Sequence, residues 1–407
     1  MNLYLLQRKH ISLAAALFFV AVIVRMAFTT FYPVSPMAGG DPKAYWSFAQ
    51  GIFNGEGFRS TVEPWLADRP PLYPYFLATI FLLFGENQVT VFTAQSMIGA
   101  LASMLFYLCG VRLLGEQRGL IAGLLFVFTP QLLLFSKHIL TEALYLALLV
   151  ALLAILVLPA KLRSRHWALA GISLGMISLC RREALLPAGL IALLYLYQRT
   201  SPDKKAFARG TAALIVIAGL TLAPWLVRNW RIFGAPLLSS SGGWNFLVGN
   251  NPAARGGYTA PPAEWAAQFT GLDELGRDQK AWELTLGWIR EDPFHFIRLL
   301  PHKLIRLWGP ANNLILDSLD LVFIPFYLLG LARSMRREPG WAAVASIAFP
   351  LVGSVTLLGL VFVGEWRYRI AAYPGLLMLA AYGIPSAWLS GTLGKLRFPR
   401  FGQAKTP

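Results

Sequence analysis

The sequence has few charged residues. Asp, Glu, Lys and Arg make up 14% of its 407 residues, whereas 56% of the residues are hydrophobic. An average soluble domain is about 25% charged. The apolar residues form long uncharged runs, which are typical of membrane-spanning helices. A soluble fold would have to bury many such helices with too few polar residues to cover them, so the composition excludes a soluble globular domain.

The motifs of several chemistries are also missing. The two cysteines, Cys109 and Cys180, lie inside apolar runs without metal-ligand spacing, so we interpret them as buried thiols. The sequence contains no Walker phosphate-binding loop, no HExxH zinc motif and no internal repeat. These absences argue against nucleotide-driven transport. They also mean that a divalent metal would need ligands that are distant from one another in the sequence.

Lysine and arginine outnumber the acidic residues, 36 to 20, and give a net charge of +16. The basic residues form short clusters between apolar runs, as in the cytoplasmic loops of membrane proteins, and not a stripe along one solvated face. We therefore expect no nucleic-acid partner. The clusters are Arg8 and Lys9; Arg112 and Arg118; Lys161, Arg163 and Arg165; Arg199, Lys204, Lys205 and Arg209; Arg333, Arg336 and Arg337; and Lys395, Arg397 and Arg400.

Hydropathy predicts an all-α polytopic membrane protein with about ten spanning helices in a single membrane domain over residues 1–407. The first is interpreted as a retained helix, because the apolar run from Ile11 reaches Phe31 without a small-x-small cleavage site. The predicted spans are residues 11–31, 90–111, 119–136, 139–159, 167–182, 184–198, 210–228, 314–332, 341–363 and 369–390.

One apolar segment, residues 71–86, decides the predicted topology. It is short and contains two prolines, which suits an interfacial helix. If it crossed the membrane, the later basic clusters would change side. With 71–86 on the surface, all clusters and both termini are cytoplasmic. Two large exoplasmic segments result, residues 32–89 and 229–313, and the second contains a turn-rich stretch followed by a helix-like stretch.

The first of these segments contains two candidate sites. Asp41 follows two glycines that would let a ligand approach the backbone, and its carboxylate could act as a general base. Alternatively, Asp41 is the N-cap of a helix that begins at Pro42. The pair Asp68-Arg69 precedes a double proline. This pair could hold a substrate phosphate, a metal ion or each other.

Several charged residues also fall within or beside the predicted spans, at the exoplasmic ends. Intramembrane charges are costly and are usually functional, although arginines near helix ends can also reach the membrane surface. Because arginine binds phosphate in bidentate fashion, an exoplasmic cluster indicates an anionic partner, either a lipid-linked phosphate or lipid head groups. These residues are Arg25, Glu142, Arg181, Arg182, Glu183, Arg228, Arg231, Arg367 and Arg369.

The order of these motifs resembles the GT-C membrane glycosyltransferases, in particular the protein O-mannosyltransferase and lipid A aminoarabinose transferase type. A first helix is followed by Gly-Asp-Pro-x-x-Tyr, which contains Asp41 and Tyr45, and then by Asp-Arg-Pro-Pro-Leu-Tyr-Pro from Asp68. Further matching elements are Thr141-Glu142, Ala223-Pro224-Trp225 with Arg228-Asn229, Gly249-Asn250-Asn251-Pro252, and Arg367-Tyr368-Arg369 with Tyr373-Pro374. The resemblance covers most of the chain.

The resemblance implies an inverting glycosyltransferase that uses a sugar carried on a polyprenyl phosphate. Asp41 would deprotonate the hydroxyl of a lipid, glycan or protein acceptor, and arginines would stabilise the departing phosphate. The family often has Asp-Glu where this chain has Asp41-Pro42, so a second acid is missing. In the aminoarabinose transferases the acid at the position of Asp68 is linked to metal binding. A bacterial inner membrane, with an exoplasmic active site, is the implied location.

The residues predicted to bind substrate or phosphate come from both segments and from the spans. They are Arg25, Tyr45, Asp68, Arg69, Glu142, Arg181, Arg182, Arg228, Arg367 and Arg369, with Asp68 as the candidate metal ligand. The alternative function is a flippase or transporter of a lipid-linked sugar, which would need charges along a path through both leaflets. A third is a scaffold that binds lipid-linked sugars without turnover.

Overall fold

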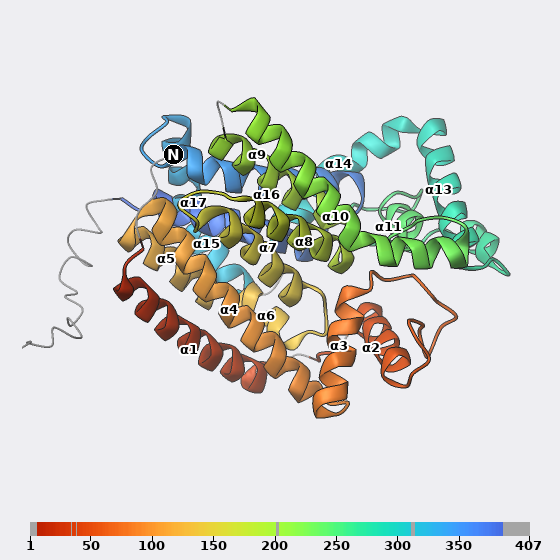
Figure 1. The fold of residues 1–407 in the computed structure, drawn as a ribbon. Coiled ribbons are helices and arrows are strands. Elements are labelled where there is room, and N and C mark those ends of the chain that lie inside the picture. The colour runs from red at the N-terminus through yellow and green to blue at the C-terminus, as the bar shows by residue number, and fades with distance from the viewer. Residues whose placement is uncertain (1–5, 34, 38, 201–202, 311–313, 386–407) are drawn as a thin grey trace, which may run out of the picture.

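The computed structural model describes residues 6–33, 35–37, 39–200, 203–310 and 314–385, and these residues form helices and connecting loops without a strand (Figure 1). The α-helices are α1 (Arg8–Phe31), α2 (Gly40–Phe53), α3 (Leu72–Phe84), α4 (Gln88–Leu114), α5 (Glu116–Phe128), α6 (Pro130–Lys137), α7 (Glu142–Val157), α8 (Ser164–Cys180), α9 (Leu185–Thr200), α10 (Lys204–Phe233), α11 (Gly242–Gly249), α12 (Ala263–Ala266), α13 (Glu274–Glu291), α14 (Pro293–Trp308), α15 (Leu314–Met335), α16 (Trp341–Val361) and α17 (Tyr373–Gly383). The 3-10 helices are η1 (Arg182–Ala184), η2 (Ala267–Phe269) and η3 (Trp366–Ala372).

Four of the described helices are long and apolar enough to cross a membrane, namely α1, α4, α10 and α16. The pair α5 and α6 would make a fifth span, bent by 44° at the break between them. Each of the ten predicted segments is helical where the structure describes it, so the all-helical class is confirmed. By length and composition, however, the described residues support only four to five spans: α7, α8 and α9 have 16 or 17 residues each, α17 has 11, and α15 is not among the candidate spans.

Local signals in the sequence explain where several helices begin and end. Asp203, Asp273 and Asp292 are the N-caps of α10, α13 and α14, and each side chain accepts a backbone N–H of the first turn. Pro293 occupies the first turn of α14, where its missing N–H costs nothing. α10 ends at Gly234, which has a φ of 70°, a left-handed conformation that suits glycine.

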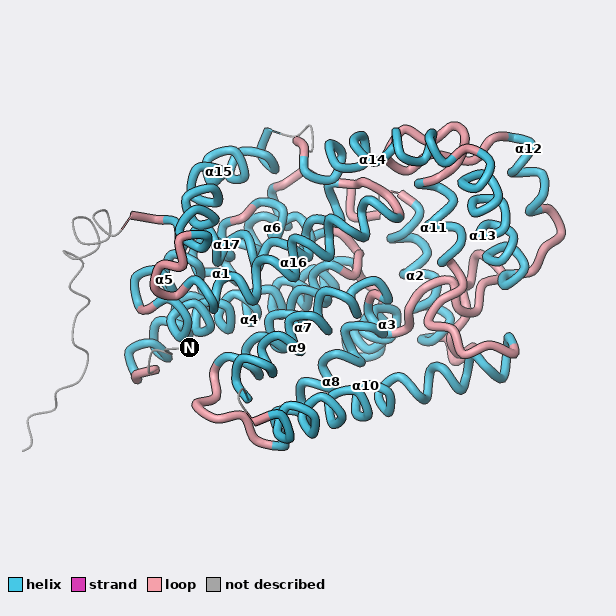
Figure 2. The backbone as a smooth tube through the Cα atoms, turned by 90° about the horizontal axis from the view of Figure 1, so that it is seen from above, coloured by secondary structure: helices cyan, strands magenta, loops and turns pink. Residues whose placement is uncertain are grey.

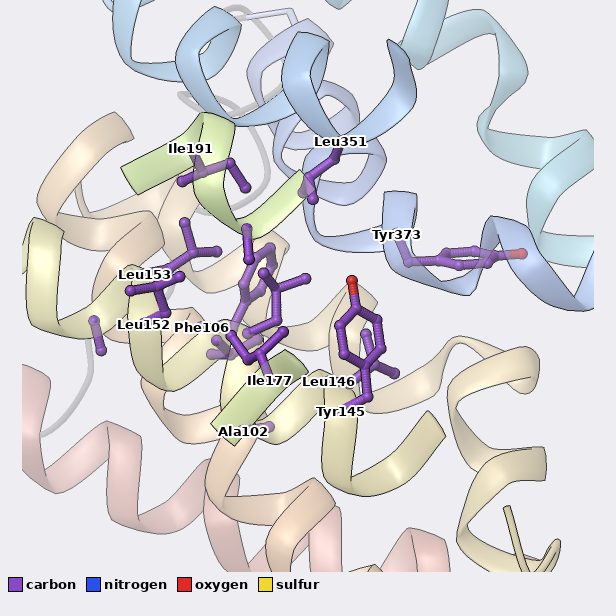
Figure 3. Packing of buried hydrophobic residues seen from close by; sticks show 14 of the residues in the cluster. Ala102, Phe106, Tyr145, Leu146, Leu152, Leu153, Ile177, Ile191, Leu351 and Tyr373 are labelled. Atoms are coloured by element: carbon purple, nitrogen blue, oxygen red, sulfur yellow. The ribbon is translucent and has the colours of Figure 1, made fainter. Parts of the chain in front are cut away.

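Most of the helices pack into one bundle with an apolar core. α4 packs against α1, α5 and α7, and α10 packs against α8. Figure 3 shows the centre of this core, where Phe106 of α4, Leu152 of α7 and Ile177 of α8 meet Ile191 of α9 and Leu351 of α16. These side chains are buried, and the cluster therefore joins helices that are far apart in the sequence.

Helices from the two long segments, residues 32–89 and 229–313, lie at one end of the bundle. α2 and α3 lie at the same end as α11 and α13, as both views show (Figures 1 and 2). The predicted interfacial segment 71–86 is the helix α3, and the predicted helix-like stretch is α13. Two further helices, α11 and α14, were not predicted, and α11 lies in the stretch expected to be turns. The cluster at Lys395, Arg397 and Arg400 lies outside the described residues.

Candidate functional site

A cleft of about 1110 Å³ opens where this end region meets the bundle. Its walls come from five parts of the chain: α2, the loop before α3, the residues around the end of α6, the pair α11 and α13, and the loop that follows α16. Both predicted exoplasmic segments therefore contribute to one cavity. The charged residues that line it include Asp41, Asp68, Arg69, Arg277 and Arg367.

Asp41 lies in the first turn of α2 and its carboxylate is shared between two arginines. Oδ1 accepts a hydrogen bond of 2.8 Å from Arg69, and Oδ2 accepts one of 2.8 Å from Arg367. The N-cap of α2 is Gly39, without a side-chain cap, so the alternative interpretation of Asp41 as the N-cap is wrong. The carboxylate instead joins residues that are 326 positions apart in the sequence.

The same arginine connects Asp41 to a deeper layer of charges. Arg367 Nε donates to Glu142 Oε1 at 2.5 Å, and Arg181 approaches that oxygen at 3.0 Å. The side chain of Glu142 is completely buried, and that of Arg181 is 9% exposed. Arg181 also donates to Glu183 at 2.9 Å. Acids and arginines thus alternate from the cleft into the protein, and each buried charge has a partner of opposite sign.

The pKa of Asp41 reflects this environment. Burial alone would raise the pKa of the carboxyl group, but the positive charges of Arg69 and Arg367, with the hydrogen bond from Arg367, lower it to about 2. Asp41 is therefore ionised at neutral pH. A carboxylate with such a low pKa is a weak base, because proton transfer is most effective when the pKa of the base lies near the working pH.

Tyr45 and Asp68 support the position of Arg69. The guanidinium carbon of Arg69 lies 5.7 Å from the ring centre of Tyr45, one turn further along α2 than Asp41. Arg69 Nε lies 3.4 Å from the carboxylate of Asp68. Arg69 is thus held between two carboxylates and an aromatic face, so its guanidinium has a fixed orientation in the cleft.

Arg182 and Arg228 contact mainly uncharged oxygen atoms. Arg182 donates to the hydroxyl of Ser239 at 2.8 Å and to the carbonyl of Ser241 at 3.0 Å. Arg228 donates to the carbonyls of Phe58 and Leu66 at 2.8 and 2.7 Å. The bonds of Arg182 tie η1 to the segment before α11, and those of Arg228 tie the end of α10 to the loop between α2 and α3. Neither residue lines the large cleft.

Arg25 and Arg369 lie away from the large cleft. Arg25 is buried in α1 against Gly99 of α4. A Cβ atom at residue 99 would lie only 2.7 Å from the Nε of Arg25, so glycine makes room for this arginine. Arg369 pairs with Asp320 at 3.1 Å and lies 3.6 Å from Asp317. Neither arginine lines the cleft or the smaller cavity described next, so the structure does not bring them together with Asp41.

A smaller cavity of about 90 Å³ adjoins the cleft. Arg181, Arg182 and Glu183 line it together with apolar residues from α9, from the end of α16 and from η3. Tyr368 and Asn245 line both cavities. Arg367 lines only the cleft and Arg181 only the smaller cavity, so the charge network through Glu142 extends from one to the other.

The described residues do not form a metal-binding cluster of three or more His, Cys, Asp or Glu side chains. Asp68, the candidate metal ligand, faces Arg69 instead. His138 lines the cleft, but burial lowers its pKa and its Nδ1 is buried without a hydrogen-bond partner among the described atoms. The residues around Asp68 do not fit a divalent ion, and we assign no step to one.

Sequence analysis missed the residues that form the outer wall of the cleft. Arg277 lies over the ring of Trp65 at 4.9 Å and over that of Trp244 at 5.8 Å. Glu274 and Asp278 accept backbone N–H bonds from the loops that carry these tryptophans. The only sign of this wall in the sequence was the predicted helix that corresponds to α13. No pattern in the sequence indicates which segments that helix contacts.

The fold is shared with solved membrane enzymes. The chain superposes on the apo crystal structure of the Archaeoglobus fulgidus oligosaccharyltransferase with a TM-score of 0.56 and 14% identity, covering 91% of this chain and 50% of that one. The same protein, AglB, in complex with an inhibitory peptide and a dolichol-phosphate, gives a TM-score of 0.54 at 14% identity, covering 92% and 50%. This chain thus spans about half the length of those proteins.

A third similar structure is ArnT from Cupriavidus metallidurans bound to undecaprenyl phosphate. Its TM-score is 0.42 at 15% identity, and the alignment covers 94% of this chain and 78% of that one. No curated protein matches the chain by sequence.

Composition and the candidate spans define an integral membrane protein, and its fold is similar to that of the oligosaccharyltransferase structures. Residues 68–226 match the model of the dolichyl-phosphate-mannose-protein mannosyltransferase family. For these residues, the match confirms the resemblance that the order of motifs indicated. The matched segment begins at Asp68 and includes Glu142 and Arg181.

Proposed function

We propose that the chain transfers a sugar from a polyprenyl-phosphate carrier to the hydroxyl group of an acceptor, with inversion at the anomeric carbon. The observation that carries this proposal is the position of Asp41, whose carboxylate lies in the large cleft between the guanidinium groups of Arg69 and Arg367. A base and two phosphate-binding cations are thus adjacent. This combination suits a reaction in which a hydroxyl attacks and a phosphate leaves.

Asp41 is the proposed general base. In the structure its lone pairs are occupied by Arg69 and Arg367, which lower its pKa to about 2. A donor phosphate would compete for the same guanidinium groups, because Arg binds phosphate in bidentate fashion. Each contact that shifts from the carboxylate to the phosphate raises the pKa of Asp41. Donor binding would therefore increase the basicity of Asp41 before an acceptor hydroxyl is deprotonated.

The arginines are proposed to stabilise the leaving phosphate. As the glycosidic bond breaks, negative charge grows on the phosphate oxygens, and fixed cations nearby stabilise that charge without having to reorganise. Glu142 supports this role because it fixes Arg367 and Arg181 from the buried side, at 2.5 and 3.0 Å. Glu142 is therefore a positioning residue in this proposal.

The smaller cavity is the proposed entry for the lipid part of the donor. It is mainly apolar, it is lined by α9 and α16, and Arg181 and Arg182 lie at its charged end. An isoprenoid chain could occupy the apolar part while its phosphate reaches the arginine layer. The acceptor would then enter through the large cleft, which shares Tyr368 and Asn245 with this cavity, so that donor and acceptor would meet at these residues.

The proposed setting is the exoplasmic face of a bacterial inner membrane, with ten spans, both termini in the cytoplasm, and α2 and α3 at the membrane surface. The basic clusters between the spans support this orientation. Single cysteines at Glu283 in α13 and at Arg163 before α8 test it. A membrane-impermeant maleimide should label residue 283 in intact cells and residue 163 only after lysis. The reverse labelling pattern would contradict the orientation.

Asp41→Asn is the direct test of the proposed activity. Loss of the base should reduce transfer by about 10²- to 10⁴-fold. The purified protein in lipid nanodiscs would be assayed with polyprenyl-phosphate-linked hexoses and pentoses, by release of polyprenyl phosphate. Glu283→Gln, at an exposed site on α13, is the matched control and should keep full activity. Wild-type transfer rates in the Asp41→Asn protein would refute the assignment of Asp41.

A second experiment identifies the substrates. Cells that lack the protein should lose one sugar from one lipid, glycan or protein, and mass spectrometry of each fraction would show which one. Unchanged glycans and lipids, together with movement of labelled donor across vesicles that contain the purified protein, would favour a flippase instead.

A further inference from the structure

Arg277 differs from the other arginines of the large cleft. Arg69 and Arg367 each contact at least one carboxylate within 3.4 Å. Arg277 also lines the cleft, and among the described residues it has no ion-pair partner. A half-buried cation without a carboxylate is available to an external anion.

Two indole rings fix the guanidinium of Arg277 in place. Its central carbon lies 4.9 Å from the ring centre of Trp65 and 5.8 Å from that of Trp244. Trp65 comes from the loop before α3, Trp244 from α11 and Arg277 from α13. Contact with aromatic faces orients a guanidinium without using its N–H donors, so these donors stay free for hydrogen bonds.

Two acids on α13 hold the loop that carries Trp65 and the first turn of α11, which carries Trp244. Glu274 accepts the backbone N–H groups of Leu66 and Ala67 at 2.6 and 2.9 Å, directly after Trp65. Asp278 accepts the N–H of Gly243 at 2.6 Å and lies 3.4 Å from the N–H of Trp244. One turn of helix therefore presents Arg277 and also positions both rings beside it.

The same hydrogen bonds explain why these acids leave Arg277 without an ion pair. The carboxylates of Glu274 and Asp278 are committed to backbone amides, and the hydroxyl of Ser240 also donates to Glu274. Burial raises the pKa of both acids. Arg277 is thus the residue that this arrangement leaves available to a ligand.

We propose that Trp65, Arg277 and Trp244 form a clamp that binds an oxyanion, a carboxylate or a phosphate, on the acceptor substrate. This inference rests on the proposed function and adds the chemical class of the acceptor: a hydroxyl compound that also carries an anionic group. The clamp belongs to the acceptor side because none of its three residues lines the apolar cavity proposed for the donor lipid. The donor phosphate has its own arginines beside Asp41.

Binding of small anionic probes tests the clamp without requiring the true acceptor. Wild-type protein in uncharged lipid nanodiscs should bind glucose 6-phosphate and glucuronate more tightly than glucose, by isothermal titration calorimetry. Arg277→Met should weaken binding of both anions about 10- to 100-fold, the value of a charge-assisted bidentate contact. Arg277→Lys should recover part of the affinity, because it keeps the charge but loses the planar fork.

Arg290→Met is the matched control, since Arg290 is an exposed arginine on the same helix. It should bind both probes like the wild type. Modification with phenylglyoxal covers the case in which Arg277→Met does not fold. In the wild-type protein, either anionic probe should protect Arg277 from modification, as mapped by mass spectrometry, and glucose should not.

Three results would overturn the inference. The first is equal binding of the anions by Arg277→Met and wild type, and the second is glucose binding that depends equally on Arg277. The third is loss of polyprenyl-phosphate binding in Arg277→Met, which would assign the clamp to the donor. Asp41→Asn separates the two proposals: it should bind the probes normally while transfer is lost. Normal transfer in Asp41→Asn with Arg277-dependent probe binding would refute only the role of Asp41.

Discussion

The large cleft contains two kinds of positively charged site, and they differ in what balances the charge. Around Asp41, arginines and carboxylates alternate, and Arg69, Arg181 and Arg367 each contact an acid. At the outer wall, aromatic rings hold Arg277 and the nearby acids bind backbone amides. The first site is partly buried and internally neutralised, so a phosphate must displace existing contacts there. The second leaves its cation available from the start.

Because of this difference, mutations at the two sites should affect the stability of the protein differently. The carboxylate network is part of the folded structure, because removing one member leaves other charges buried without a partner. The clamp uses aromatic contacts that stay in place when a ligand binds or leaves. Mutations in the network should therefore affect folding and activity together, whereas changes to Arg277 should affect binding alone.

The largest effect on stability is expected for Glu142→Gln. The side chain of Glu142 is completely buried and contacts Arg367 and Arg181. An amide cannot neutralise these two guanidinium groups, so we expect a loss of about 3–5 kcal/mol, as for other broken buried ion pairs. Thermal unfolding of the purified protein, followed by fluorescence, would measure the loss. Glu63→Gln, at an exposed position in the cleft, is the control; equal stability of the two variants would refute the structural role of Glu142.

The sequence could predict the parts of the site where a charge in an apolar segment is energetically costly or where a local pattern is present. Glu142 and Arg181 stood out because charges beside apolar runs are rare, and the helices around them follow from hydropathy. The pairing of these residues could not be predicted. Asp41 contacts Arg367 across 326 positions, and no local rule connects them. The same is true of Arg277, whose role depends on two loops that α13 brings together.

The errors in the fold also have physical reasons. α11 was missed because three serines precede it and two glycines begin it, a pattern that favours turns, yet Asp278 fixes its first turn through the N–H of Gly243. α14 was missed because Pro301 lies inside it. In both helices tertiary contacts outweigh local preference. Conversely, the interpretation of Asp41 as an N-cap followed a valid local rule, but its carboxylate binds Arg69 and Arg367 instead of the backbone of α2.

A smaller effect, on catalysis, separates two neighbouring arginines. Arg367→Lys should lower transfer about 10- to 100-fold, because lysine keeps the charge but cannot bridge Asp41 and Glu142 in a fixed plane. Arg369→Lys is the comparison, since Arg369 contacts Asp320 outside the cleft. It should lower the unfolding temperature and leave the turnover of the folded fraction unchanged. If Arg369→Lys reduced turnover and Arg367→Lys did not, the assignment of the network to catalysis would be wrong.

The smallest predicted effect is on acid stability, and it concerns the Asp41 ion pairs alone. The folded pKa of Asp41 is about 2, below the ordinary value of 3.8. Its contribution to stability is therefore fully present above about pH 4 and is lost as the pH falls toward 2. The contribution is small, because the side chain is 35% exposed and solvent screens the pairs. Asp41→Asn should lower the unfolding temperature by about 1–2 °C at pH 7, and the difference from wild type should shrink between pH 4 and pH 2.

Saturating polyprenyl phosphate should reduce the difference at pH 7 as well, because the phosphate takes the arginines from Asp41. An unchanged difference with the lipid bound would show that Arg69 and Arg367 stay on the carboxylate, and the proposed increase in the basicity of Asp41 would be wrong.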